Sequence, residues 1–269
     1  MKILLRFTAS IAVPLLMGAA SFGQHYTQTN LVSSTPGTAG VTDPEFINTW
    51  GLARSSGSVL WISENVTGVV VLYNGEGTEQ SLAVTIPPAD PTNKNTPKGS
   101  PTAGIFNGSQ TDFLLAPGKP AEFLFATVDG AIAGWNPDVG LAPGATPPST
   151  QAVAVVKTND GSAYTGLTSA FVNGKPYLYA ANFAKGRVDV YDSAFHLVSP
   201  PKDQSYDNSP FSETSFVDES LPPRYVPFNV KAIGNDIVVT YVVHQEGSPL
   251  ETDGPGWVSS IFSAPPVGC

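Results

Sequence analysis

The chain has 269 residues, and its 22 acidic residues outnumber 13 basic ones, giving a formal net charge of −9 at pH 7. This acidic balance argues against nucleic acid as a partner. With 26 glycines, 25 prolines and 13% charged residues, the composition favours many turns between short strands over amphipathic helices. The single cysteine, Cys269, offers no internal disulfide, so stability must come from core burial and strand pairing.

Residues 1–23 have the pattern of an export signal. Lys2 and Arg6 give a basic start, an apolar stretch follows, and small residues end the segment. A retained membrane anchor is the alternative, although the stretch is short for a span. No later segment approaches the ~20 apolar residues that a span needs. We therefore expect a signal peptide over 1–23, a domain over 24–269 with a net charge of −11, and a secreted, periplasmic or extracellular protein without a membrane span.

A unit of two apolar runs joined by a glycine-containing turn recurs along the rest of the chain. Its copies are 61–74, 123–136, 177–192 and a less regular one over 237–262. In the first three, an aromatic residue follows the turn glycine by five positions: Gly68 and Tyr73, Gly130 and Trp135, Gly186 and Tyr191. A strand-rich repeat of this length is typical of a β-propeller blade, so the fold class is all-β, with about four blades of four antiparallel strands.

Each unit divides further. It opens with a strand containing Gly51-Leu52, Gly104-Ile105, Gly166-Leu167 or, in the fourth, Phe228-Asn229-Val230, and an outer strand such as 81–86 or 152–156 closes it. The three glycines of the hairpins are expected in turns, where positive φ favours glycine. A helix over any of the first three copies would contradict this arrangement.

In a four-stranded meander, the turn between strands two and three lies on the same face as the link to the next blade. The candidate binding residues on this face are Glu64, Asn65, Asp129, Asn182 and Lys185. The fourth copy of the repeat should add His244 to the same face. Polar loops on a rigid scaffold often bind partners, here an extracellular protein, a glycan or a small ligand. Solvated linkers are the alternative interpretation.

The repeated aromatic residues Tyr73, Trp135 and Tyr191 have two interpretations. They can pack between neighbouring blades, because each ends a third strand, or they can form an aromatic box for a sugar. The first is expected, because each blade must bury its face against the next.

The sequence contains no nucleophile elbow, no H-E-x-x-H motif and no C-x-x-C pair. The remaining enzymatic possibility is a hydrolase, lactonase or lyase that holds Ca²⁺ in a central tunnel, since Ca²⁺ takes six to eight oxygen ligands. Oxygen donors near the openings of first strands are Glu45, Asn48, Asn107 and Asn229. Ordinary turn and strand-end roles are the alternative for these residues, and no cofactor is then required.

Several segments resemble propellers of the NHL type, and more closely a family of secreted bacterial propeller proteins of unknown function. The segments that carry the likeness are 29–34, 41–53, 61–77, 123–137, 177–192 and 225–242. The resemblance implies a six-bladed ring and brings no catalytic residue with it. The expected last strands are missing, so the ring should be incomplete or truncated, with strand alternation lost at Ser259-Ser260 and with 27–34, which would complete the final blade, left without a partner strand.

From these patterns we expect a secreted propeller that acts as a binding or scaffolding module at the cell exterior. The alternative is the Ca²⁺-dependent hydrolase, lactonase or lyase. Acidic residues that converge in the tunnel would favour the enzyme, and an uncharged tunnel beside a decorated loop face would favour the binding module.

Overall fold

A computed structural model describes residues 27–200, 205–206, 209–212, 214–245 and 251–263. The secondary structure of these residues consists of strands and turns, without a helix, which confirms the expected all-β class. Within the same residues, no helix is present that is long and apolar enough to cross a membrane. The expected signal peptide over 1–23 lies outside the described residues.

Four antiparallel sheets follow one another along the chain, each built from consecutive or nearly consecutive strands. Sheet I contains β3 (Thr49–Ala53), β4 (Leu60–Glu64), β5 (Val69–Tyr73) and β6 (Glu79–Thr85). Sheet II contains β7 (Pro101–Phe106), β10 (Phe123–Thr127), β11 (Ala131–Trp135) and β12 (Val153–Lys157). Sheet III contains β13 (Tyr164–Val172), β14 (Lys175–Asn182) and β15 (Arg187–Tyr191), and sheet IV contains β16 (Tyr225–Ile233), β17 (Asp236–His244) and β18 (Glu251–Ser263).

Two small pairs complete the strand list. The strands β1 (Val32–Ser33) and β2 (Val41–Thr42) pair in parallel, and β8 (Leu114–Ala116) and β9 (Lys119–Pro120) form a short hairpin. Each of the four large sheets thus begins with the opening strand that the sequence predicts, and sheets I and II end with the predicted outer strands.

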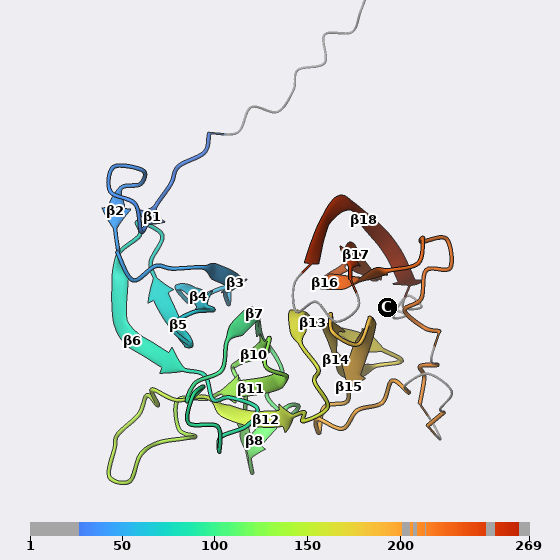
Figure 1. The fold of residues 1–269 in the computed structure, drawn as a ribbon. Helices are drawn as coiled ribbons and strands as arrows, with labels where there is room; N and C mark the ends of the chain where they lie inside the picture. The colour runs from blue at the N-terminus through green and yellow to red at the C-terminus, as the bar shows by residue number, and fades with distance from the viewer. Residues whose placement is uncertain (1–26, 201–204, 207–208, 213, 246–250, 264–269) are drawn as a thin grey trace, which may run out of the picture.

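The four sheets are arranged in an open arc, with their first strands β3, β7, β13 and β16 nearest the middle (Figure 1). The strands β3 and β7 run in the same direction, because Gly51 lies against Ala103 and Ala53 lies against Gly104. The strands β13 and β16 also run in the same direction, because Gly166 lies against Asn229 and Thr168 Oγ1 accepts from the Ala232 N–H. Sheets I and IV stand at the two ends of the arc (Figure 1). Equivalent ends of the four first strands therefore meet at the same end of a common axis.

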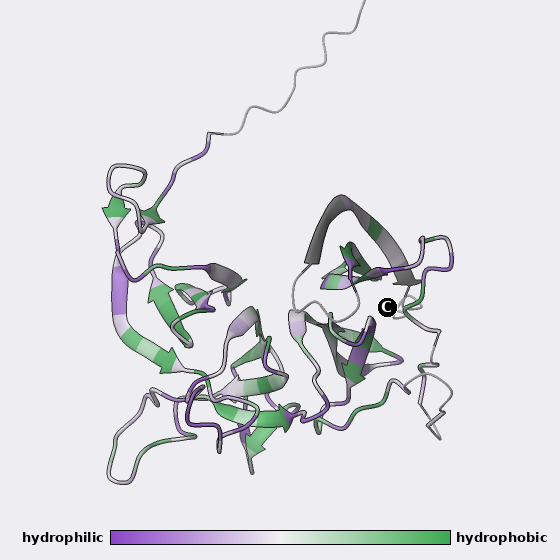
Figure 2. Cartoon of the chain, in the orientation of Figure 1, coloured by the Kyte–Doolittle hydropathy of each residue, from purple (hydrophilic) through white to green (hydrophobic). Residues whose placement is uncertain are grey.

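Hydrophobic cores lie between consecutive sheets. Trp61 and Val70 of sheet I pack with Phe123 and Trp135 of sheet II, and comparable clusters join sheet II to III and sheet III to IV. Figure 2 shows hydrophobic residues concentrated along strands such as β5 and β12, with hydrophilic residues in many of the connectors. Burial between sheets is thus the main cohesion of the fold, as the absence of an internal disulfide required.

The three repeat glycines occupy the predicted turns. Gly68, Gly130 and Gly186 have φ angles of 69°, 89° and 63° and join the second strand to the third in sheets I, II and III. Two of them also lie close to the next connector: a methyl group on Gly68 would meet the Gly99 carbonyl at 2.7 Å, and one on Gly130 would meet the Ser162 carbonyl at 2.8 Å. Positive φ and close approach together explain why glycine recurs here.

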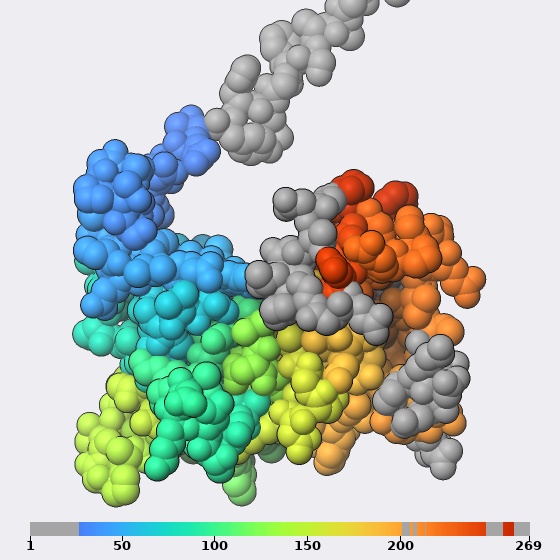
Figure 3. Space-filling view, in the orientation of Figure 1, coloured from blue at the N-terminus to red at the C-terminus, as the bar shows by residue number. Residues whose placement is uncertain are grey.

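The repeated aromatic residues pack in the core rather than forming a box. Trp135 joins the cluster between sheets I and II, and Tyr191 joins the one between sheets II and III. Tyr73, the equivalent residue of sheet I, instead packs edge-to-face on Phe46, with ring centroids 5.4 Å apart. Residues 27–47, the N-terminal segment, thus cover the face of sheet I where a preceding sheet would stand (Figure 3).

Three expectations need correction. Sheets III and IV have three strands rather than four in the described part of the chain. The last strand was expected to degenerate at Ser259-Ser260, but β18 continues through these residues and pairs there with β17. The segment 27–34, expected to lack a partner strand, pairs locally through β1 and β2, because the turn between them returns the chain alongside itself.

Candidate functional site

Each of the four first strands contains a β-bulge. In sheets I, II and III the bulge lies opposite the last two residues of the second strand, and in sheet IV it lies opposite Thr240 and Tyr241, three residues before the end of β17. One residue is left unpaired between Thr49 and Gly51, between Pro101 and Ala103, between Tyr164 and Gly166, and between Pro227 and Asn229. The four bulged residues are Trp50, Thr102, Thr165 and Phe228. Bulges redirect side chains and are common beside active sites, so the four-fold recurrence marks this end of the axis as the candidate site.

Two of the bulged residues place aromatic rings at this end. Trp50 of sheet I and Phe228 of sheet IV come from opposite ends of the arc, yet their ring centroids are 6.0 Å apart. Phe183 lies 6.2 Å from Phe228, and the ring of His244 lies 4.6 Å from Phe183. We call Trp50, Phe183, Phe228 and His244 the ring cluster. It bridges the two ends of the arc, and Trp50 keeps 41% of its surface exposed.

The backbone around the ring cluster is conformationally restrained. Asn48 precedes β3 with a φ of 51°, and Arg224 precedes β16 with a φ of 81°. The Asn48 Oδ1 atom accepts a hydrogen bond from Trp50 Nε1 at 3.0 Å, which fixes the indole orientation. These two backbone conformations set the direction in which the chain enters the strands that carry Trp50 and Phe228.

The other two bulged residues join neighbouring sheets. Thr102 Oγ1 donates to the Tyr164 carbonyl at 2.7 Å, and Thr165 Oγ1 donates to the Phe228 carbonyl at 2.5 Å. Both threonines are buried. The bulges of sheets II and III therefore tie their own sheet to the next one, whereas those of sheets I and IV present rings.

Asp129, a predicted binding residue, holds the connector between sheets I and II. Its Oδ2 accepts from the Ala89 backbone N–H at 2.7 Å and its Oδ1 accepts from the Ser100 N–H at 3.0 Å. The carboxylate thus bonds both ends of residues 89–100. It also contributes to a polar cavity of about 720 Å³ that Asp90 and Lys157 line on the same face.

Asn182 and Lys185 perform a similar task one sheet later. Asn182 is fully buried; its Oδ1 accepts from Ala163 N–H, and its Nδ2 donates to Asp189 Oδ2 at 2.7 Å. Lys185 is exposed, and its Nζ donates to the Asp160 carbonyl of the connector before sheet III. Both residues therefore fix that connector against the turn of sheet III.

Glu64 and Asn65 lie at the end of β4. Glu64 is 2% exposed, and its Oε2 accepts from Thr67 Oγ1 at 2.7 Å. Burial raises the pKa of Glu64, and the nearby carboxylate of Asp43 adds to this rise. Asn65 Nδ2 donates to the Ser100 and Pro101 carbonyls at 3.3 and 3.4 Å, so it joins sheet I to the start of sheet II.

The four candidate Ca²⁺ ligands do not converge. Asn48 and Asn229 adjoin the ring cluster through Trp50 and Phe228, whereas Asn107 follows the far end of β7, a strand about 20 Å long. Asn107 Nδ2 donates to the Ala121 carbonyl at 2.8 Å and holds a loop. Glu45 is exposed in the N-terminal segment, and the described residues contain no group of three His, Cys, Asp or Glu side chains suited to a metal ion.

The predicted loop face exists, but its polar side chains are largely engaged in holding connectors. The ring cluster was not identified from the sequence, except for His244, which was expected on this face. The available signal was the aromatic residue before Gly51 and before Asn229, at positions where the middle sheets carry threonine. A bulge cannot be read from a single strand, because it depends on the register with its partner.

No protein-family model matches the chain. It is 26% identical over 236 residues to "Uncharacterized protein R648" of Acanthamoeba polyphaga mimivirus, and the match covers 87% of this chain. The same match covers 53% of the viral protein, so the chain spans about half the length of this relative.

Solved structures with similarity include the computationally designed Ika4 protein, at 13% identity and a TM-score of 0.40, covering 88% of this chain and all of that one. The dihydro-heme d1 dehydrogenase NirN in complex with DHE has 13% identity and a TM-score of 0.31, over 80% of this chain and 58% of its own. The PQQ-bound aldose sugar dehydrogenase of Streptomyces coelicolor has 12% identity and a TM-score of 0.34, over 79% and 81% respectively.

Proposed function

We propose that this chain is a secreted binding module of the NHL-like propeller type, whose four sheets are blades and whose ligand contact is the ring cluster. The observation that supports this is the recurrence of the bulge, which places Trp50 and Phe228 at one end of the axis. The polar residues around them hold connectors and keep that end rigid. A rigid frame that displays aromatic rings is typical of binding surfaces.

The chemistry of the ring cluster favours a glycan as the ligand. Flat aromatic rings stack on the apolar C–H face of a sugar ring. The exposed Asn48 lies beside Trp50, and its Oδ1, which accepts from Trp50 Nε1, has a second lone pair that can accept from a sugar hydroxyl. Trp50 is exposed but held by Asn48, so little side-chain freedom is lost when a ligand stacks on it.

The test is titration of the purified chain with soluble cello-, xylo- and chito-oligosaccharides, followed by tryptophan fluorescence and calorimetry. At least one series should bind saturably, and Trp50→Ala should weaken that binding at least ~10-fold, as expected for an aromatic hot spot. The matched control is Trp257→Ala, because Trp257 is 46% exposed on β18, outside the ring cluster. Equal loss in both variants, or no saturable binding in any series, would contradict the proposal.

Export is part of the same proposal. Residues 1–23 should be absent from protein recovered outside the cytoplasm, because they combine a basic start, an apolar middle and small residues at the end. Intact-mass measurement decides this point. Soluble cytoplasmic protein that retains Met1 would contradict export while leaving the binding experiment unaffected.

A further inference from the structure

The outer face of sheet I carries apolar side chains at positions that form core in the other sheets. Leu60 faces Tyr73 across the ladder, as Phe123 faces Trp135 and Leu178 faces Tyr191. The core residues at the two equivalent positions of sheets II and III are at most 2% exposed: Phe123, Phe125, Leu178 and Ala180. In sheet I the corresponding residues, Leu60 and Ile62, are only half-buried. An apolar surface of core type is therefore left incompletely filled.

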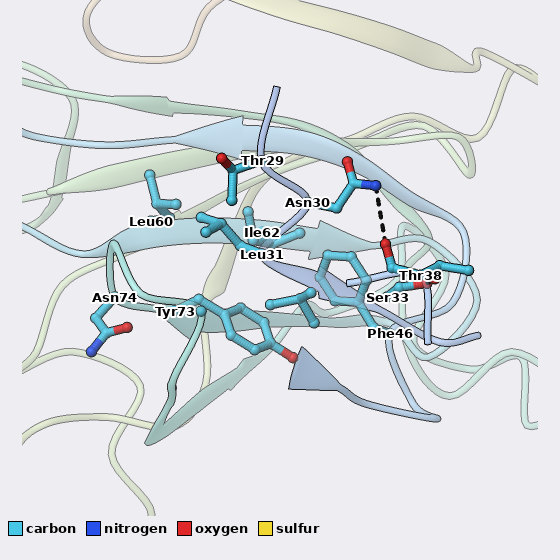
Figure 4. Close-up of a pocket in the computed structure, with 12 residues that line it drawn as sticks. Thr29, Asn30, Leu31, Ser33, Thr38, Phe46, Leu60, Ile62, Tyr73 and Asn74 are labelled. Carbon is cyan, nitrogen blue, oxygen red and sulfur yellow. Dashed lines mark hydrogen bonds between the residues drawn. The ribbon is translucent and has the colours of Figure 1, made fainter. Parts of the chain in front are cut away.

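A cavity of about 440 Å³ occupies this place, between Leu60 and Ile62 on β4 and the N-terminal segment (Figure 4). Figure 4 shows Leu31, Phe46 and Tyr73 as further apolar parts of its lining. Its volume lies within the range of ~300–1,000 Å³ common for small-molecule sites.

The cover of the cavity is fixed by backbone hydrogen bonds. Gly40 and Val41 donate from their N–H groups to the Asn30 and Leu31 carbonyls at 3.1 and 2.9 Å. Leu31 also rests on the β5–β6 turn, because a methyl group at Gly77 would lie 3.0 Å from the Leu31 carbonyl oxygen. The cavity is thus formed before any ligand arrives, which lowers the cost of binding.

The lining determines which ligands fit. None of the twelve lining residues carries a formal charge, and the polar ones offer hydroxyl and amide groups, as in Thr29, Ser33 and Asn74. The Tyr73 hydroxyl donates to Asp43 Oδ2 at 2.5 Å, and burial raises the pKa of Tyr73, so this wall stays neutral. Asp43 lies beyond the lining, where its carboxylate is bonded to Tyr73 and disfavours a nearby anion, and the lining itself offers no carboxylate to pair with a cation.

We propose that this cavity is a binding site for a small neutral amphiphile, with an apolar body on Leu60 and Ile62 and one hydroxyl or carbonyl group at the polar rim. The site is separate from the ring cluster and does not depend on glycan binding. An alkyl chain buried here would gain the contacts that a neighbouring sheet supplies to Phe123 or Leu178 in the other cores.

The experiment compares three probes of equal chain length on the purified chain: octan-1-ol, octanoate and octylamine, each titrated by NMR and calorimetry. Octan-1-ol should bind saturably at one site, at least ~10-fold tighter than either charged probe. Its methylene protons should show nuclear Overhauser contacts to the methyl groups of Leu60 and Ile62 on the unmutated chain. This last measurement needs no variant, so it stands even if a substitution prevents folding.

Substitution then locates the site. Ile62→Phe fills the cavity and should abolish octan-1-ol binding, whereas Ile233→Phe, the matched control at a residue 60% exposed on β16, should leave it unchanged. Gly77→Ala should weaken binding by moving Leu31, while Gly234→Ala, at a similar positive φ but with open space around it, should not.

Three results would overturn the inference. These are the absence of saturable octan-1-ol binding, binding of octanoate or octylamine as tight as that of octan-1-ol, and binding that survives in a folded Ile62→Phe chain. None of them would bear on the titration of oligosaccharides with Trp50→Ala.

Discussion

Gly166 offers the sharpest test of how closely the first strands approach one another. A methyl group at this position would lie 2.8 Å from Asn229 Cα and 2.9 Å from the Val230 nitrogen, and it would also meet Asn229 Oδ1. Ordinary contacts of such a carbon lie at 3.4–4 Å. The two obstructing backbone atoms belong to β16 and cannot rotate away, so β13 and β16 must separate by about half an ångström or more, which loosens the core between sheets III and IV.

Gly166→Ala should therefore lower the free energy of unfolding by about 1–3 kcal/mol, the usual cost of overpacking. For a domain of this size, the midpoint of thermal unfolding should fall by roughly 2–4 °C per kcal/mol. Urea and thermal unfolding, followed by circular dichroism, measure both quantities. The matched control is Gly57→Ala, because a methyl group there has nothing within 4 Å and the φ of Gly57 is not positive.

The control should change stability by less than ~0.5 kcal/mol or raise it slightly. A Gly166→Ala chain within ~0.5 kcal/mol of the unmutated protein would refute the close approach of β13 and β16. Equal losses in the two variants would show that the cost comes from glycine replacement in general and not from the contact.

Three further predictions concern polar groups. Asp129→Ala should lower the free energy of unfolding, measured in urea, by about 2–4 kcal/mol, because it removes two charge-assisted bonds to the connector. The control Asp138→Ala breaks an exposed ion pair and should lower it by under ~1 kcal/mol, so similar losses in the two variants would contradict this role for Asp129. Burial raises the pKa of Glu64 above its ordinary value of 4.5, so the ionised carboxylate opposes folding at neutral pH and the penalty vanishes below pH 4.5. Glu64→Gln should thus raise the free energy of unfolding at pH 7.5 but not at pH 4, and a constant difference across this range would argue against burial as the cause. Thr165→Val should cost about 1–3 kcal/mol by removing the donor to the next sheet, while Thr214→Val on the exposed surface should change stability by under ~0.5 kcal/mol, and urea unfolding of both variants decides the point.

Much of the fold could be predicted because the repeat combines two local signals, a turn glycine and an aromatic residue five positions later. Gly130 and Trp135 illustrate this: one needs positive φ and the other ends a buried strand, and both requirements follow from sequence position alone. The strand β18 was harder to predict, because its pairing with β17 does not require the alternation that was sought in its sequence.

The candidate site could be predicted only in part, since its contacts join distant segments. Trp50 meets Phe228 across the arc, and Asp129 reaches back to Ala89, and neither contact leaves a local pattern. The sequence correctly placed Asp129 beside the connector, but it could not show that both carboxylate oxygens are occupied by backbone N–H groups. Side-chain direction in a turn depends on which connector packs against it, and that is a property of the assembled arc.

The bulge leaves one residue in each first strand unpaired with the second strand, and this residue has one of two roles in the four sheets. Thr102 and Thr165 each donate a hydrogen bond to the first strand of the next sheet and so hold the two sheets together. At Trp50 no such bond is needed, because the Asn65 amide donates to the Pro101 carbonyl and joins sheet I to sheet II. The bulged position of each sheet can therefore either bond the next sheet or present an aromatic ring. A threonine at position 50, with Asn65 retained, would remove the exposed ring and add a second bond to a neighbour that Asn65 already holds, while the strand register stays the same.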